Sequence, residues 1–293
     1  MAAGRLAWVL NLDADLELGA RARYAPTKKV LAAMRPHVEA LRGSLLGPDD
    51  MLVDETTPPD SAKARVGRAF CPTPRALAIL RRAGAVPEPH PNVAVLREVN
   101  GRAFCTSLGP TLEGGAFVTD LHEAVRKLEG APPFADAWRI KRAHGMSGRG
   151  QRVVRAGQLA NDDLVFLRAG LAEAGVQIEP NVTIEAEYGL HGVLAQDGSL
   201  ELGRIVRQIC DARGQWTKTE LAAHVPSSIV AAFEDEVRRV GKALSEAGYF
   251  GPFGVDGFSY RDARGETLFQ PRSEINARYS MGFGIGLRGE GKG

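Results

Sequence analysis

"FQPRSEINARYSMG", residues 269–282, places an acid, an amide and a base at alternating positions near the end of the 293-residue sequence. These are Glu274, Asn276 and Arg278, separated by the apolar Ile275 and the small Ala277. In an extended strand, residues two apart project from the same face, so the three polar groups share a face. Such a face is either the solvated side of an edge strand or a rigid floor that holds metal and phosphate.

A second acid stands in the segment before it, "GPFGVDGFSY" (251–260). Asp256 lies at mid-strand among apolar residues, and a buried acid needs a partner. If the two segments pair, Asp256 can oppose Glu274 and Asn276, and three oxygen ligands on a sheet suit Mg²⁺. Asp256, Glu274 and Asn276 are therefore candidate metal ligands. Arg278 is a candidate contact for a phosphate or a developing oxyanion.

A glycine-rich turn follows the strand-like segment "WRIKRA" (138–143), which carries Lys141. Glycines let backbone N–H groups approach phosphate oxygens, and the lysine adds a cation. The pattern fits neither a P-loop nor a Rossmann turn, which leaves a flap between two strands or a plain flexible hairpin. The candidate phosphate-binding residues of this flap are Lys141, His144, Gly145, Ser147, Gly148 and Gly150.

The stretch "VQIEPNVTIEAEYG" (176–189) holds two further acids at expected strand ends, Glu179 and Glu187. An extended linker here can offer backbone N–H and C=O groups to an adenine edge and an acid to a ribose hydroxyl. Two exposed carboxylates with no ligand are the alternative.

The rest of the chain predicts a mixture of α/β and α+β structure. Strand and helix alternate up to about Gly101, beginning with an apolar strand over 5–12, and Pro36 is expected to interrupt the helix that follows. Further helices are predicted over 73–85, 119–130 (capped by Thr119), 162–175 and 225–248. We expect an N-terminal α/β domain over 1–118, a second domain over 119–288 and a disordered tail over 289–293.

The composition gives no electrostatic reason to expect nucleic acid or membrane partners. Lys and Arg number 37 against 35 Asp and Glu, so the formal net charge is only +2. The three cysteines are widely spaced and form no zinc motif, and the N-terminus lacks the long apolar run of a signal peptide. We therefore expect a cytoplasmic protein with reduced thiols. A homodimer is the default expectation for its assembly.

Taken in order, these segments resemble the ATP-grasp superfamily over roughly residues 100–290. The strongest match is "SEINARYSMG", which is similar to the family's acid-x-Asn-x-Arg signature, followed by "WRIKRAHGMSGRG". The resemblance implies an N-terminal α/β domain followed by a two-sublayer ATP-grasp fold. Two departures stand out: Ala277 occupies a position where many members have proline, and a second lysine has no clear counterpart, the nearest residues being Lys127 and Arg102.

The resemblance also implies roles for the candidate residues. Lys141 would contact the α- or β-phosphate of ATP beneath the 144–150 loop, Ile178 and Glu179 would meet the adenine, and Glu187 the ribose. The ligands for one or two Mg²⁺ ions, with Mn²⁺ as an alternative, would be Asp256, Glu274 and Asn276. Arg278 would face the transferred phosphate. Arg207 is a weak candidate for binding a substrate carboxylate, and a solvated strand face explains it equally well.

The activity so implied is that of an ADP-forming carboxylate–amine ligase. The enzyme would activate a small-molecule or peptide carboxylate as an acyl phosphate, which an amine or sometimes a thiol then attacks. A kinase on the same scaffold shares every residue named above. A nucleotide-binding protein without turnover is a further alternative, disfavoured by the presence of all three candidate metal ligands.

Overall fold

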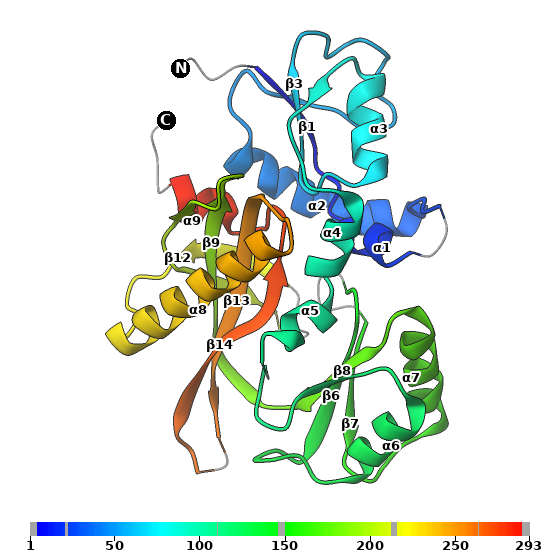
Figure 1. Ribbon diagram of the computed structural model, residues 1–293, viewed down its shortest axis with the longest axis vertical. Coiled ribbons are helices and arrows are strands. Elements are labelled where there is room, and N and C mark those ends of the chain that lie inside the picture. The colour runs from blue at the N-terminus through cyan, green and yellow to red at the C-terminus, as the bar shows by residue number, and fades with distance from the viewer. Residues whose placement is uncertain are drawn as a thin grey trace.

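The computed structural model describes residues 5–20, 23–109, 111–145, 150–211, 216–262 and 264–288. Its strands form three sheets, one at the top of Figure 1 and the other two beside one another below it. We call them the parallel sheet, the small sheet and the large sheet, and define them in turn below. None of the described helices combines the length and apolar character needed to span a bilayer.

The parallel sheet has the strand order β2-β1-β3-β4 and lies at the top of Figure 1. Its strands are two to four residues long. Thr73 caps α3 with its side chain and Pro74 occupies the first turn, as the sequence predicts. The elements are β1 (Leu6–Val9), α1 (Ala14–Gly19), α2 (Lys28–Leu45), β2 (Met51–Leu52), β3 (Val66–Ala69), α3 (Pro74–Arg82) and β4 (Val86–Pro87).

Helix α2 corrects one expectation, because it continues through Pro36 without a break. A proline inside a helix removes one hydrogen bond and costs about 3 kcal/mol. The face that carries Met34, Leu41 and Leu45 is buried, and this burial offsets the cost. Two short helices then lead out of the parallel sheet, α4 (Val93–Val99) and α5 (Arg102–Ser107).

The small sheet is antiparallel with the order β5-β8-β6-β7 and carries α6 and α7 on one face (Figure 1). Its core is its own, built around Trp138, Ile140, Leu167 and Ile178. Asp120, rather than the predicted Thr119, caps α6, since its carboxylate accepts from the backbone N–H of Glu123. The elements are β5 (Ala116–Val118), α6 (Leu121–Glu129), β6 (Ala137–Arg142), β7 (Gln151–Arg155), α7 (Asn161–Glu173) and β8 (Val176–Pro180).

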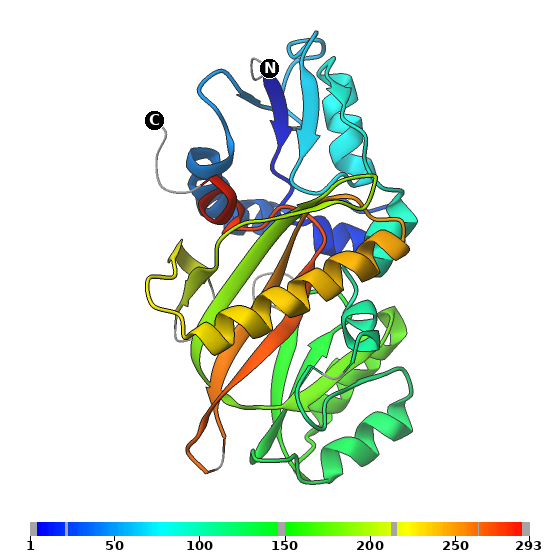
Figure 2. The same cartoon turned by 60° about the vertical axis from the view of Figure 1, so that its left-hand side comes forward.

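The large sheet is antiparallel with the order β12-β11-β9-β13-β14, and β10 pairs with β9. Helix α8 crosses the face of this sheet and contacts β9 and β14 (Figure 2). The apolar side chains of Phe233, Val237 and Val240 on α8 pack into the hydrophobic core beneath the helix, consistent with the predicted amphipathic pattern. The elements are β9 (Thr183–Leu194), β10 (Leu200–Leu202), β11 (Val206–Cys210), β12 (Trp216–Leu221), α8 (Ser227–Glu246), β13 (Gly251–Arg261), β14 (Thr267–Asn276) and α9 (Phe283–Arg288).

The large sheet and the parallel sheet share one hydrophobic core. Trp8 and Phe70 from the parallel sheet belong to the same buried cluster as Phe253 and Tyr279 from the large sheet. The backbone N–H of Tyr279 also donates to the carbonyl of Phe70. These two sheets therefore pack as one body, whereas the small sheet has a separate core.

A buried histidine of β9 makes stability depend on pH. His191 is 1% exposed, its Nδ1 has no hydrogen-bond partner among the described residues, and a Cβ at Gly254 or Gly282 would come within 2.8 Å of its ring. Burial lowers the pKa of His191 to about 4. The unfolded chain, with the ordinary pKa of about 6.5, therefore binds more protons than the folded chain between about pH 6.5 and about pH 4.

We expect the free energy of unfolding to fall by up to about 3 kcal/mol as the pH drops through this window. Above about pH 6.5 the full contribution of neutral His191 to stability is present. Chemical unfolding near about pH 7.5 and about pH 4.5 measures the effect. Other groups titrate in the same range, so the comparison is with His191→Gln, which should show a smaller loss. The same pH dependence in both proteins would show that His191 does not contribute.

Candidate active site

The candidate site is a cavity of about 590 Å³ between the small sheet and the large sheet. Strands β6, β7 and β8 line one wall, and β9, β11, β13 and β14 line the other. Asp15 of α1, Phe70 after β3 and Met34 of α2 complete the lining. The cavity brings together Lys141, Gly145, Glu179, Glu187, Asp256, Glu274, Asn276 and Arg278.

The large-sheet wall holds the predicted oxygen group. Strands β13 and β14 pair with Asp256 directly opposite Glu274, and a β-bulge follows between Asp256 and Phe258. Asn276 is 7% exposed and donates from Nδ2 to Oδ2 of Asp256 at 2.8 Å. The pairing inferred from the sequence is thus present, and it fixes two carboxylates and an amide on one face.

The charge of Asp256 is costly where it lies. Burial, and next the neighbouring Glu274 carboxylate, raise the pKa of Asp256 to about 7, although hydrogen bonds from Gln208 and Asn276 oppose this. Gln208 donates from Nε2 to Oδ1 of Asp256 at 2.6 Å. Two carboxylates held this close favour an added positive charge. Arg102 supplies part of it from behind, since its Nη2 lies 3.2 Å from Oε1 of Glu274.

Lys141 lies on the opposite wall of the cavity and is buried. It is 8% exposed and forms an ion pair with Glu179, which is 3% exposed. The second carboxylate oxygen of Glu179 accepts from Gln177 at 2.9 Å and from Thr111 at 3.2 Å. Glu179 is therefore neither exposed nor unpartnered, and its side chain holds the lysine toward the cavity.

Arg278 follows the end of β14 and contacts the parallel sheet. Its Nη2 donates to Oδ2 of Asp15 at 2.6 Å, and its guanidinium lies over the ring of Phe70 at 5.3 Å. Asp15 lies in the first turn of α1, and Phe70 directly follows β3. Asp15 thus fixes the orientation of the arginine at the edge of the cavity.

Several candidates lie elsewhere. His144 packs against Gly19 and Gly101, and the described lining of the cavity does not include it. Arg207 is exposed on β11, while its neighbour Gln208 points into the cavity, because successive strand residues face opposite sides. The structure therefore separates Arg207 from the site. Ser147 and Gly148 fall outside the described residues.

Three further predicted residues lie at or near the cavity. Glu187 lies within β9 rather than at a strand end, and its carboxylate accepts from the thiol of Cys210 at 2.7 Å. Ile178 is fully buried on β8, and Gly150 precedes β7 with φ of 77°. Neither of them belongs to the described cavity lining.

Sequence reasoning missed Asp15, Gln208 and Arg139, which all line the cavity. Asp15 follows the first apolar segment, in "NLDADLE". Acids that follow a strand of a parallel sheet often lie near a ligand site, and this pattern could have identified Asp15. Gln208 is on the same strand as Arg207, but the two side chains point to opposite faces of the sheet. The sequence does not show which of the two faces lines the cavity.

Comparison with known proteins agrees with this architecture. No protein-family model matches the chain. The butirosin acyl-carrier protein–L-glutamate ligase of Niallia circulans is 26% identical over 207 residues, which cover 65% of this chain and 46% of that protein. The chain therefore spans about half the length of this curated relative.

Two solved structures overlay most of the chain. D-alanyl-alanine synthetase A from Vibrio cholerae has a TM-score of 0.56 at 12% identity and covers 97% of this chain and 91% of its own. N5-carboxyaminoimidazole synthetase from Staphylococcus aureus, complexed with ADP, has a TM-score of 0.53 at 12% identity. This match covers 96% of the present chain and 72% of the synthetase. At such identities the similarity establishes the fold, and the chain has the ATP-grasp fold. The predicted fold class is confirmed.

Proposed function

We propose that this chain is an ADP-forming ATP-grasp ligase that activates a carboxylate for attack by an amine. The observation that carries the proposal is the cavity between the two sheets. Its small-sheet wall presents the cations Lys141 and Arg139, and its large-sheet wall presents the oxygen ligands around Asp256. ATP would lie between them, with its phosphates at Lys141 and its adenosine near Glu179 and Glu187.

The large-sheet residues fit a divalent cation. Glu274, Asp256 and Asn276 offer oxygen donors, which Mg²⁺ prefers and Mn²⁺ accepts, and a cation would relieve the repulsion that raises the pKa of Asp256. The described part of the chain holds no cluster of three His, Cys, Asp or Glu side chains suited to a metal. The proposed ligand set is therefore two carboxylates, Asp256 and Glu274, with the amide of Asn276 as the third oxygen donor. When bound, the ion would neutralise phosphate charge.

The protein's own groups would position the reactants and balance charge. An oxygen of the substrate carboxylate attacks the γ-phosphorus, the bond to the bridging oxygen breaks, and ADP leaves. The amine nitrogen then attacks the carbonyl carbon of the acyl phosphate, the C–O bond to phosphate breaks, and inorganic phosphate leaves while the amine loses a proton. Lys141 and Arg278 would hold the phosphoryl group, and the closed cavity would limit hydrolysis.

The curated relative favours a second candidate for the acceptor. Its name makes an acyl-carrier protein the partner of that enzyme. A thiol at the end of a carrier arm can attack an acyl phosphate as an amine does and yields a thioester. We therefore keep a carrier-bound acceptor beside a free amine.

The release of ADP tests the proposed activity. The purified chain is incubated with Mg-ATP and a panel of carboxylates and amines, each alone and in pairs. A ligase releases ADP only when both an acid and a nucleophile are present. ADP release with a phosphorylated hydroxyl acceptor would instead indicate a kinase, and ATP binding without turnover over the whole panel would indicate a non-catalytic protein.

Hydrogen exchange tests where the nucleotide lies. We expect exchange at residues 144–150 and 274–278 to slow when Mg²⁺ and a non-hydrolysable ATP analogue bind, because both segments would contact the triphosphate. Residues 146–149 lie outside the described part of the structure, so this remains a prediction from the glycine-rich sequence. Slowing at 274–278 alone would retain the metal site and refute the phosphate-binding loop. Slowing at neither segment would refute both.

A further inference from the structure

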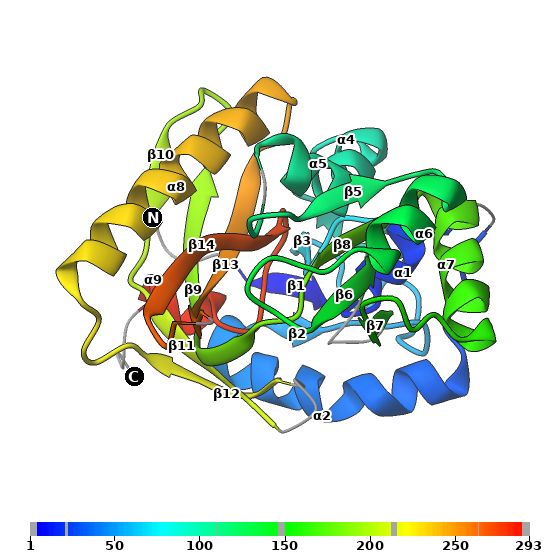
Figure 3. The same ribbon diagram turned by 90° about the horizontal axis from the view of Figure 1, so that it is seen from below.

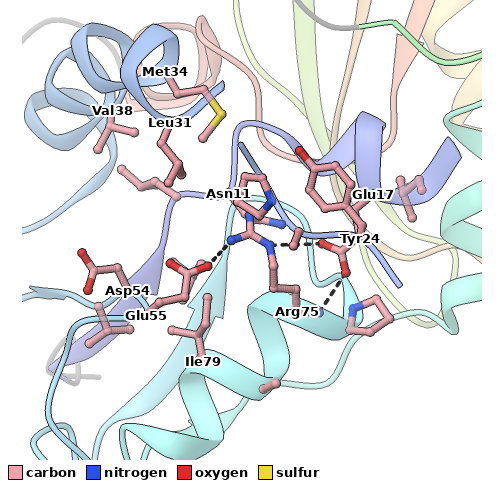
Figure 4. Close-up of a pocket in the computed structure, with 18 of the residues that line it drawn as sticks. Asn11, Glu17, Tyr24, Leu31, Met34, Val38, Asp54, Glu55, Arg75 and Ile79 are labelled. Atoms are coloured by element: carbon pink, nitrogen blue, oxygen red, sulfur yellow. Dashed lines mark hydrogen bonds and ion pairs between the residues drawn. The ribbon is translucent and has the colours of Figure 1, made fainter. Parts of the chain in front are cut away.

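A second and larger cavity, about 1040 Å³, lies beside the parallel sheet and is distinct from the active site. It opens at the carboxyl ends of β1 and β2, between α2 and α3. Open parallel sheets bind ligands at this edge, where the strand order reverses. Figure 4 shows Leu31, Met34 and Val38 projecting from α2 toward Ile79 and Arg75 of α3.

The two ends of this cavity differ in character. Leu31, Val38 and Ile79 make an apolar wall near α2, and Leu31 remains 44% exposed. At the other end, the Arg75 side chain is bound by Asp13 and Glu55 and lies 5.9 Å from the ring of Tyr24. An occupant with apolar segments and a few polar groups fits this lining.

Exposed cations border the cavity along α2. The helix carries four basic side chains and a single acid, Glu39. Lys28, Arg35 and Arg42 recur every seven residues, which places them on one face, next to Leu31 and Val38. The exposed Glu39 lies on the same face between Arg35 and Arg42, so the three cations outnumber one acid there. All three cations are exposed and form no ion pair or side-chain hydrogen bond with described residues. We call them the basic stripe; Figure 3 shows α2 at the lower edge of the molecule, away from α8.

One residue connects the second cavity to the active site. Met34 is the residue shared by the linings of the two cavities, and its flexible thioether side chain is 6% exposed. The two cavities therefore adjoin at Met34. A long arm entering from outside α2 would reach the carboxylates only if the flexible Met34 side chain moved aside.

We propose that the basic stripe docks an acidic carrier domain, and that the second cavity receives the carrier's pantetheine-type arm. This proposal rests on the ligase function proposed above and names the acceptor for the same site. The terminal thiol of the arm, or the amine of an aminoacyl group that the thiol carries, attacks the carbonyl carbon of the acyl phosphate and loses its proton to solvent. A C–S or C–N bond forms, the C–O bond to phosphate breaks, and phosphate leaves. Charge complementarity between stripe and carrier sets the association rate and its dependence on salt.

Binding of a holo acyl-carrier protein tests the docking surface. Its affinity for the full chain is measured at low and high salt, and so is that of the apo form, which lacks the arm. We expect the double variant Lys28→Glu/Arg42→Glu to bind the carrier at least about tenfold more weakly at low salt. The matched control, Arg81→Glu/Lys242→Glu, reverses exposed charges on α3 and α8 and should bind normally. Equal losses in the two double variants, or no carrier binding to the unmodified chain at low salt, would overturn the proposal.

A second pair of variants tests the cavity. Ala32 and Ala40 are both exposed on α2, but only Ala32 lines the cavity. We expect Ala32→Trp to remove the affinity advantage of the holo carrier over the apo carrier, and Ala40→Trp to retain it. An advantage that persists in Ala32→Trp would refute the placement of the arm.

Three further outcomes distinguish this proposal from its alternatives. If α2 binds vesicles of phosphatidylcholine and phosphatidylglycerol but not the carrier, the stripe is a membrane surface and the proposal is wrong. If free amines support full ADP release and the carrier neither binds nor stimulates, the ligase function stands and the docking proposal fails. If the carrier binds in a stripe-dependent manner but no acid and nucleophile release ADP, the docking surface stands and the ligase function fails.

Discussion

ATP-dependent turnover by Glu274→Gln is expected to fall by at least about 100-fold while the protein stays folded. Glu274 lies opposite Asp256 on paired strands, so its removal halves the negative charge available to a cation. The substituted amide keeps an oxygen that can still accept from Arg102, and this preserves the packing behind the strand. Asn276→Ala should act in the same direction, because it deletes the third oxygen donor and the hydrogen bond to Asp256.

Three measurements check this expectation: ADP release, calorimetric binding of Mg-ATP, and thermal unfolding. Glu246→Gln on α8 is a suitable control, because Glu246 is exposed and remote from the cavity. Unchanged ATP turnover in a folded Glu274→Gln/Asn276→Ala double variant would remove the metal-site interpretation of β14.

Lys141→Ala is expected to destabilise the protein by about 3–5 kcal/mol, because it leaves Glu179 buried without its cation. Gln177 and Thr111 still donate to the carboxylate, but neither is charged. In the double variant Lys141→Met/Glu179→Gln no charge remains at this position, and most of the lost stability should return. ATP affinity should not return, because the cation that faces the phosphates is still missing.

The comparison separates folding from binding. Chemical unfolding gives the stability of the unmodified chain, the single variant and the double variant, and calorimetry gives their ATP affinity. If the single variant is as stable as the unmodified chain, the ion pair is dispensable for folding. If the folded double variant binds ATP with normal affinity, Lys141 does not contact the nucleotide.

The sequence could predict features that depend on local order. The alternation of Glu274 and Asn276 follows from the two-residue period of a strand, and the cap at Thr73 from the residue types at a helix start. The opposing position of Asp256 required only that two neighbouring segments form a hairpin. These inferences survive because each depends on short segments of chain.

Other features depend on packing between distant segments, and the sequence did not reveal them. The burial of Lys141 depends on its ion pair with Glu179, which lies on a different strand, β8. Asp15 and Arg278 are 263 residues apart, so nothing local connects them. Arg207 and Gln208 have equivalent sequence patterns, and only the covered face of the large sheet selects Gln208. The domain boundary after residue 118 stays a prediction.

The ion pair between Asp15 and Arg278 has a consequence for the exchange of parts between related enzymes. Arg278, which we propose to hold the phosphoryl group, takes its orientation from an acid in the N-terminal layer, and both residues lie against the shared core. The N-terminal layer is therefore not an independent module, and a chimera that replaces it must supply an acid at the position of Asp15. The small sheet, with its separate core, is the part of this chain best suited to transplantation.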